Sequence, residues 1–212
     1  MNLPNKISVA RILLLPVFAF FYLATFIPGN YLISAIIFTI AALTDFVDGQ
    51  IARRCNLVTD LGKFLDSIAD KLIVIAALIL VTADGTIPAP YGVIASIIII
   101  SREFMVSALR QISAANGHIL AADMWGKYKA TFQFLSLPLL MFQAQVKASG
   151  WFGATGLMVV EIINYVLLGA VVGLTIISAI HYFVKNRAVL TEEPSKVTLT
   201  KTVTNNEGEK AE

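Results

Sequence analysis

The sequence contains a single cysteine, Cys55, which excludes a disulfide framework and any metal site built from several cysteines. Charged residues are also scarce, at 14% of the chain, whereas soluble domains carry about a quarter. The net charge of +2 comes from 16 basic and 14 acidic residues, a balance that does not indicate a nucleic-acid partner. The remainder is strongly apolar, with 57% hydrophobic residues and a mean hydropathy of +0.77. This composition is typical of a protein embedded in a membrane.

Long apolar runs make up most of the chain, and no alternating strand pattern interrupts them. A bilayer core of about 30 Å needs roughly 20 apolar residues per helix. Runs of about this length occupy residues 9–27, 31–52, 66–83, 91–113, 128–146 and 156–184. We therefore predict an all-α, polytopic membrane protein with six transmembrane helices. Residues 1–187 form its membrane domain, and the polar segment 188–212 is expected to be a disordered tail.

Basic residues are concentrated at alternate ends of these runs. They are Lys6 and Arg11 near the N-terminus, then Arg53, Arg54 and Lys63, then Arg110, Lys127 and Lys129, and finally Lys185 and Arg187. The opposite connections offer only Lys147. Because short cytoplasmic loops carry the excess of Lys and Arg, we predict a multi-pass protein of the cell membrane. Both termini and the active site would then face the cytoplasm.

Four aspartates lie where a membrane protein rarely places charge. Asp45 and Asp48 are three residues apart, and Asp66 and Asp70 are four apart, so each pair lies on one helical face. Pairing with neighbouring Arg and Lys would join the two helices, but burying ions costs several kcal/mol each. Convergent oxygen ligands without His or Cys instead favour Mg²⁺, Mn²⁺ or Ca²⁺. Two such ions would hold a phosphoryl group during an in-line displacement.

Small residues accompany the first pair of acids. Gly49 and Ala52 share the helical face of Asp48 and leave room for a ligand against the helix. Arg53 adds a planar group suited to phosphate. The residues thus indicate a site for a phosphorylated ligand and divalent metal.

The motif formed by these residues resembles the signature of the CDP-alcohol phosphatidyltransferase family. Asp-x-x-Asp-Gly-x-x-Ala-Arg, eight residues, and Gly-x-x-x-Asp-x-x-x-Asp run unbroken from Asp45 to Asp70. The start Leu3-Pro4-Asn5-Lys6-Ile7-Ser8-x-x-Arg11 and the stretch from Ser101-Arg102-Glu103-Phe104 through Leu109-Arg110 to Gly126-Lys127-x-Lys129 resemble the branch that uses glycerol 3-phosphate. Ser67, where many members of that branch have proline, is a mild departure.

The resemblance implies transfer of the phosphatidyl group of CDP-diacylglycerol to the hydroxyl of an alcohol, with release of CMP. It implies that Asp70 is the general base and that two divalent cations, Mg²⁺ or Mn²⁺, bind Asp45, Asp48, Asp66 and Asp70. It also suggests a homodimer. The residues expected beside CDP-diacylglycerol are Asn5, Asp48, Gly49, Ala52, Arg53, Thr59, Gly62 and Ser67.

A basic group near the fourth and fifth runs is expected to bind the phosphate of the acceptor, sn-glycerol 3-phosphate. Its members are Arg110, Lys127 and Lys129, with Arg102 as a weaker candidate; alternatively, these residues only determine topology. Glu103 is expected to pair with a neighbouring helix. Two other functions remain open: a related enzyme with inositol phosphate, serine or phosphatidylglycerol as acceptor, and a non-enzymatic cation carrier. A carrier would spread ionisable groups along a route, whereas here the acids lie at one level.

Overall fold

The computed structural model describes residues 3–54, 60–115 and 124–186. Within these residues the chain forms six α-helices and no β-strand, so the predicted all-α class is confirmed. The helices are α1 (Leu3–Leu23), α2 (Asn30–Arg54), α3 (Asp60–Ala83), α4 (Tyr91–Ala115), α5 (Met124–Ser149) and α6 (Gly153–Lys185). The predicted tail 188–212 and Cys55 lie outside the described residues.

Each of the six predicted runs falls on a different helix. The first run was predicted to continue to residue 27, but α1 ends at Leu23. The chain turns there instead, and Gly29 adopts a positive φ of 79° before α2 begins. Ala24 to Ile27 are mostly apolar, so hydropathy alone does not reveal this turn.

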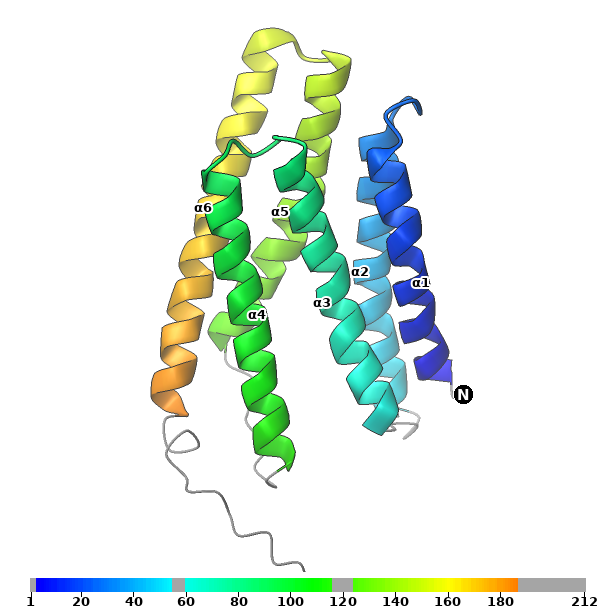
Figure 1. Ribbon diagram of the computed structural model, residues 1–212, viewed down its shortest axis with the longest axis vertical. Helices are drawn as coiled ribbons and strands as arrows, with labels where there is room; N and C mark the ends of the chain where they lie inside the picture. Colours follow the sequence, from blue (N-terminus) through cyan, green and yellow to red (C-terminus); the bar gives the residue numbers. More distant parts are fainter. Residues whose placement is uncertain (1–2, 55–59, 116–123, 187–212) are drawn as a thin grey trace, which may run out of the picture.

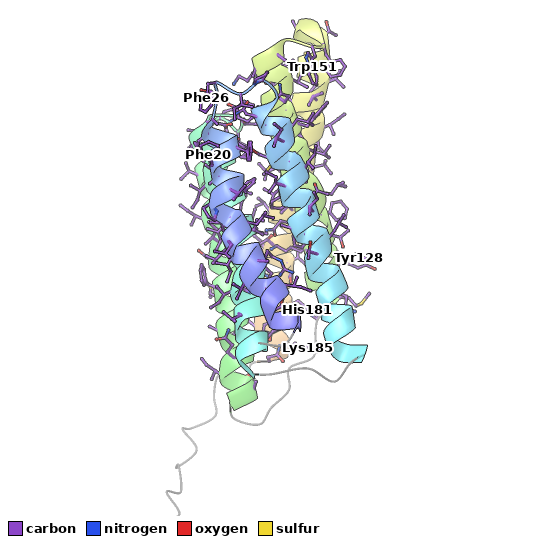
Figure 2. All side chains as sticks on the ribbon, turned by 90° about the vertical axis from the view of Figure 1, so that its right-hand side faces the viewer. Phe20, Phe26, Tyr128, Trp151, His181 and Lys185 are labelled. Atoms are coloured by element: carbon purple, nitrogen blue, oxygen red, sulfur yellow. The ribbon has the colours of Figure 1, made fainter. Side chains whose placement is uncertain are left out.

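The helices run side by side and alternate in direction (Figure 1). The N-terminus, the end of α2 and start of α3, the end of α4 and start of α5, and the end of α6 therefore share one end of the bundle, here called the basic end (Figure 1). The grouped basic residues named above lie on or near these helix ends, except Arg187, which lies outside the described residues. Figure 2 places Lys185 toward this end, and Phe26 and Trp151 at the opposite end.

The bundle is apolar both inside and outside. Phe18, Phe38, Val81 and Val171 are fully buried, while Ile97 is 59% exposed on the surface of α4. Two described segments are long and apolar enough to cross a bilayer, Tyr91–Ala114 and Gly153–Lys185. Shorter apolar helical segments are Ile7–Leu23 and Asn30–Thr44. An apolar exterior of this kind fits a lipid environment.

Helix α5 contacts α2, α3 and α6 and therefore contributes many residues to the interior of the bundle. Near the basic end its buried residues are polar: Lys129, Gln133 and Ser136. They are followed by an apolar layer of Leu137, Leu140 and Met141, each 1% exposed or less, which belongs to the main hydrophobic core. Beyond this layer Gln143 donates a hydrogen bond to the carbonyl of Thr86 and accepts one from Asn164, at 3.2 and 2.9 Å.

Candidate functional site

Asp66 and Asp70 occupy one face of α3, one turn apart, as their spacing predicted. Nη1 of Arg11 on α1 lies 3.4 Å from Oδ1 of Asp66, and the side chains of Arg11 and Asp66 are 2% and 46% exposed. In the sequence, Arg11 indicates only the membrane orientation and belongs to the family-like motif at the start of the chain. A charged residue inside an apolar helix needs a partner, and this signal indicates an inward role for Arg11.

Lys71 lies between Asp70 and Ser67 on the same helix. Its Nζ is 3.1 Å from Oδ1 of Asp70 and donates to the carbonyl and hydroxyl oxygens of Ser67 at 2.7 and 3.1 Å. The Asp70 side chain keeps 37% exposure. The carboxylate of Asp70 is therefore held near an ammonium group and still accessible to a ligand.

A group of three charges lies on the facing helices. Glu103 of α4 forms an ion pair with Lys129 of α5, and Nη1 of Arg102 lies 3.4 Å from the same Glu103 oxygen. The side chains of Lys129, Arg102 and Glu103 are 2%, 12% and 19% exposed. The prediction that Glu103 pairs with a neighbouring helix is confirmed, and its partner is one of the residues predicted to bind phosphate.

Arg102 also bonds to α6 and lies close to the backbone of α5. Its Nη2 donates to the hydroxyl of Ser178 on α6 at 2.6 Å. A Cβ added to Gly126 on α5 would lie 3.3 Å from the same Nη2, closer than most such contacts. The absence of a side chain at Gly126 thus leaves space for the guanidinium.

A cavity of about 80 Å³ lies between the aspartate side of the site on α3 and the charged group on α4 and α5. Its volume exceeds the 10–15 Å³ or so that one water molecule requires. It is lined by Asp70, Lys71 and Val74 of α3, Glu103 of α4, and Lys129, Ala130, Gln133 and Phe134 of α5. Asp70, whose carboxylate could accept a proton, and Lys129, whose ammonium could bind an anion, therefore line the same cavity.

The other predicted basic residues lie farther out. Lys127 and Lys129 are two residues apart on a helix and so point in nearly opposite directions; Lys127 is exposed and Lys129 buried. Arg110 is exposed near the end of α4, with its guanidinium carbon 5.9 Å from the ring centre of Tyr182. The structure therefore brings Arg102 and Lys129 together, and leaves Arg110 and Lys127 at the basic end.

Several predicted site residues are not described. Thr59 lies outside the described residues. The helix backbone includes Gly49 and the other five positions, but the structure does not describe the side chains of Asn5, Asp45, Asp48, Ala52 and Arg53 or the surroundings of Gly49. Gly62 and Ser67 lie on the described part of α3. Among the side chains that the structure describes, no cluster of three or more His, Cys, Asp or Glu residues is present.

The family model for CDP-alcohol phosphatidyltransferase matches residues 1–177. A relative in Bacillus subtilis (strain 168), a CDP-diacylglycerol–glycerol-3-phosphate 3-phosphatidyltransferase, is 46% identical over 151 residues, which are 66% of this chain and 76% of the relative. Relatives with the same name in Haemophilus influenzae and Rickettsia felis are 39% and 32% identical. They cover 67% and 86% of this chain and 76% and 93% of their own lengths.

Proposed function

The chain belongs to the CDP-alcohol phosphatidyltransferase family, and from this we propose that it transfers the phosphatidyl group of CDP-diacylglycerol to sn-glycerol 3-phosphate. The products are phosphatidylglycerophosphate and CMP, and the reaction is a step of phospholipid biosynthesis. The observation that carries the proposal is the name shared by relatives that are 32–46% identical to this chain. The cavity between α3, α4 and α5 adds groups of the required chemistry.

Asp70 is proposed to be the general base. An alcohol is a weak nucleophile at neutral pH, and a carboxylate beside it removes the proton as the new bond forms. The deprotonated oxygen attacks the phosphorus that carries diacylglycerol, the bond from that phosphorus to the CMP oxygen breaks, and Asp70 retains the proton. Its position on the cavity wall and its remaining exposure support this role.

The phosphate of the acceptor is proposed to bind the basic residues of α4 and α5. Lys129 lines the cavity. Arg102 lies close to Lys129, because both side chains approach the same oxygen of Glu103. Arg110 and Lys127, exposed at the basic end, would attract the dianion as it enters. This binding would place the acceptor hydroxyl near Asp70 in attack geometry.

Two divalent cations, Mg²⁺ or Mn²⁺, are proposed to bind Asp45, Asp48, Asp66 and Asp70. The described half of this set fits such a role, because Asp66 and Asp70 present hard oxygen ligands from one face and both remain partly exposed. Bound cations would neutralise the negative charge on the pyrophosphate of CDP-diacylglycerol. The nucleotide itself is assigned to Asn5, Asp48, Gly49, Ala52, Arg53, Thr59, Gly62 and Ser67.

We further propose that all six helices cross the cell membrane, with both termini in the cytoplasm and the active site facing it. The shared basic end of the bundle supports this orientation (Figure 1). Residues 1–187 would form the membrane domain and 188–212 a separate polar tail. A homodimer is the proposed assembly.

The purified full chain should release CMP from CDP-diacylglycerol when glycerol 3-phosphate and Mg²⁺ or Mn²⁺ are supplied. The acceptor panel should include serine, inositol phosphate and phosphatidylglycerol, with Asp70→Asn as the inactive control. A clear preference for another acceptor would assign the chain to a different reaction of the family. Absence of CMP release with every acceptor would overturn the enzymatic proposal and leave the carrier hypothesis.

A further inference from the structure

Gln133 is a buried amide at the candidate site whose acceptor oxygen is unused. The residue is 4% exposed and lines the cavity that contains Asp70. Within the described part of the chain, its Oε1 is buried and has no hydrogen-bond partner. The oxygen itself is not open to the cavity, but rotation of the terminal amide would turn it toward a molecule bound there. Since buried polar atoms are nearly always paired, such a molecule would supply the missing donor.

Another buried glutamine on the same helix provides a contrast. Gln143 lies beyond the apolar layer, where its amide nitrogen donates to the Thr86 carbonyl and its Oε1 accepts from Asn164. Both ends of that amide are used to join elements of the fold. Gln145 also has an unpaired Oε1, but it does not line the cavity of Asp70. Gln133 combines an unused acceptor with a place at the site.

The position of Gln133 along α5 determines which part of a ligand it would contact. It follows Lys129 by one helical turn, which is about 6 Å along the axis, so it lies deeper in the bundle than the ammonium group. The cavity wall around it includes the apolar side chains of Val74 and Phe134. A ligand with its anion at Lys129 would therefore meet one neutral polar group at the inner end, and a hydroxyl is the complementary donor.

We propose that Gln133 is a specificity-determining residue that accepts a hydrogen bond from the secondary hydroxyl of the acceptor. This inference rests on the proposed function, in which the primary hydroxyl of glycerol 3-phosphate reacts at Asp70. The secondary hydroxyl lies between the reacting carbon and the carbon that carries phosphate. Its contact with Gln133 selects a phosphorylated triol over a phosphorylated diol of the same length.

The test compares glycerol 3-phosphate with 3-hydroxypropyl phosphate, which lacks only the secondary hydroxyl. The wild-type protein should favour glycerol 3-phosphate by roughly tenfold in kcat/KM, the effect of one hydrogen bond between neutral groups. Gln133→Met, which retains the length of the side chain, should bring this ratio close to one. Gln133→Glu keeps the acceptor oxygen and should preserve the preference while KM rises for both phosphates.

Gln143→Met is the matched control, because it removes a buried amide from the same helix outside the cavity. It should keep the wild-type ratio even if the protein becomes less stable. A wild-type ratio near one, or an unchanged ratio in Gln133→Met, would overturn the inference while leaving the activity established. If Gln133→Met does not fold, loss of the preference in Gln133→Glu would overturn it. Failure of the wild type to use glycerol 3-phosphate at all would instead refute the proposed function.

Discussion

Replacing Glu103 by Gln should destabilise the bundle strongly, because it leaves two cations without their shared counter-ion. Lys129 and Arg102 are 2% and 12% exposed at the side chain, and Glu103 forms an ion pair with both. Removing one member of a buried ion pair costs about 3–5 kcal/mol in proteins. A value of about 3 kcal/mol would change the unfolding equilibrium by a factor of more than one hundred.

A double-mutant cycle separates this ionic interaction from loss of packing. Glu103→Gln, Lys129→Met and the combined variant should be unfolded in mixed micelles by increasing amounts of a denaturing detergent, with tryptophan fluorescence as the readout. The combined variant should be at least about 2 kcal/mol more stable than the sum of the single effects predicts. Lys147→Met, an exposed residue of α5 at the opposite end, is the control and should change little. Single effects that add to within about 0.5 kcal/mol would refute the argument.

Three further outcomes are expected. Asp70→Asn should abolish most of the turnover, while nucleotide binding, measured by calorimetry, remains detectable. Near-normal turnover of this variant would exclude Asp70 as the general base. Excess chelator should stop CMP release and added Mg²⁺ or Mn²⁺ should restore it, so full activity in chelator would contradict the metal assignment. Gly126→Val should displace Arg102 and raise the KM for glycerol 3-phosphate by roughly tenfold. Gly169→Ala, where an added Cβ meets nothing within 4 Å, should leave that KM unchanged.

The helices could be predicted well from the sequence because hydropathy is a local property. Each apolar run falls on one helix, and the fixed spacing of Asp66 and Asp70 places both on one face of α3. The end of α1 was harder to predict from the sequence. Its last turn and the following connection are both mostly apolar, and Pro28, Gly29 and Asn30 are the residues that signal a change of direction.

The contacts that form the site could not be predicted in the same way, since they join residues distant in sequence. Lys129 was predicted from its charge as a phosphate ligand, but its ion pair with Glu103 depends on where the fold places α4 relative to α5. Gln133 was not predicted at all, because an isolated glutamine on a mostly apolar helix carries no motif. Its importance emerges only from its burial, its unused oxygen and the cavity beside it.

The apolar layer of Leu137, Leu140 and Met141 would, under the proposed function, limit how far water can follow the substrates inward. From Ser136 to Gln143 the helix rises by about 10 Å, and across this interval the layer packs within the main hydrophobic core. In the proposed topology, an aqueous cavity open to the cytoplasm would end against a hydrocarbon barrier. Protons and metal ions could then gather at the aspartates without leaking across the bilayer, so the cell could operate a hydrophilic reaction inside its membrane and keep its electrochemical gradient.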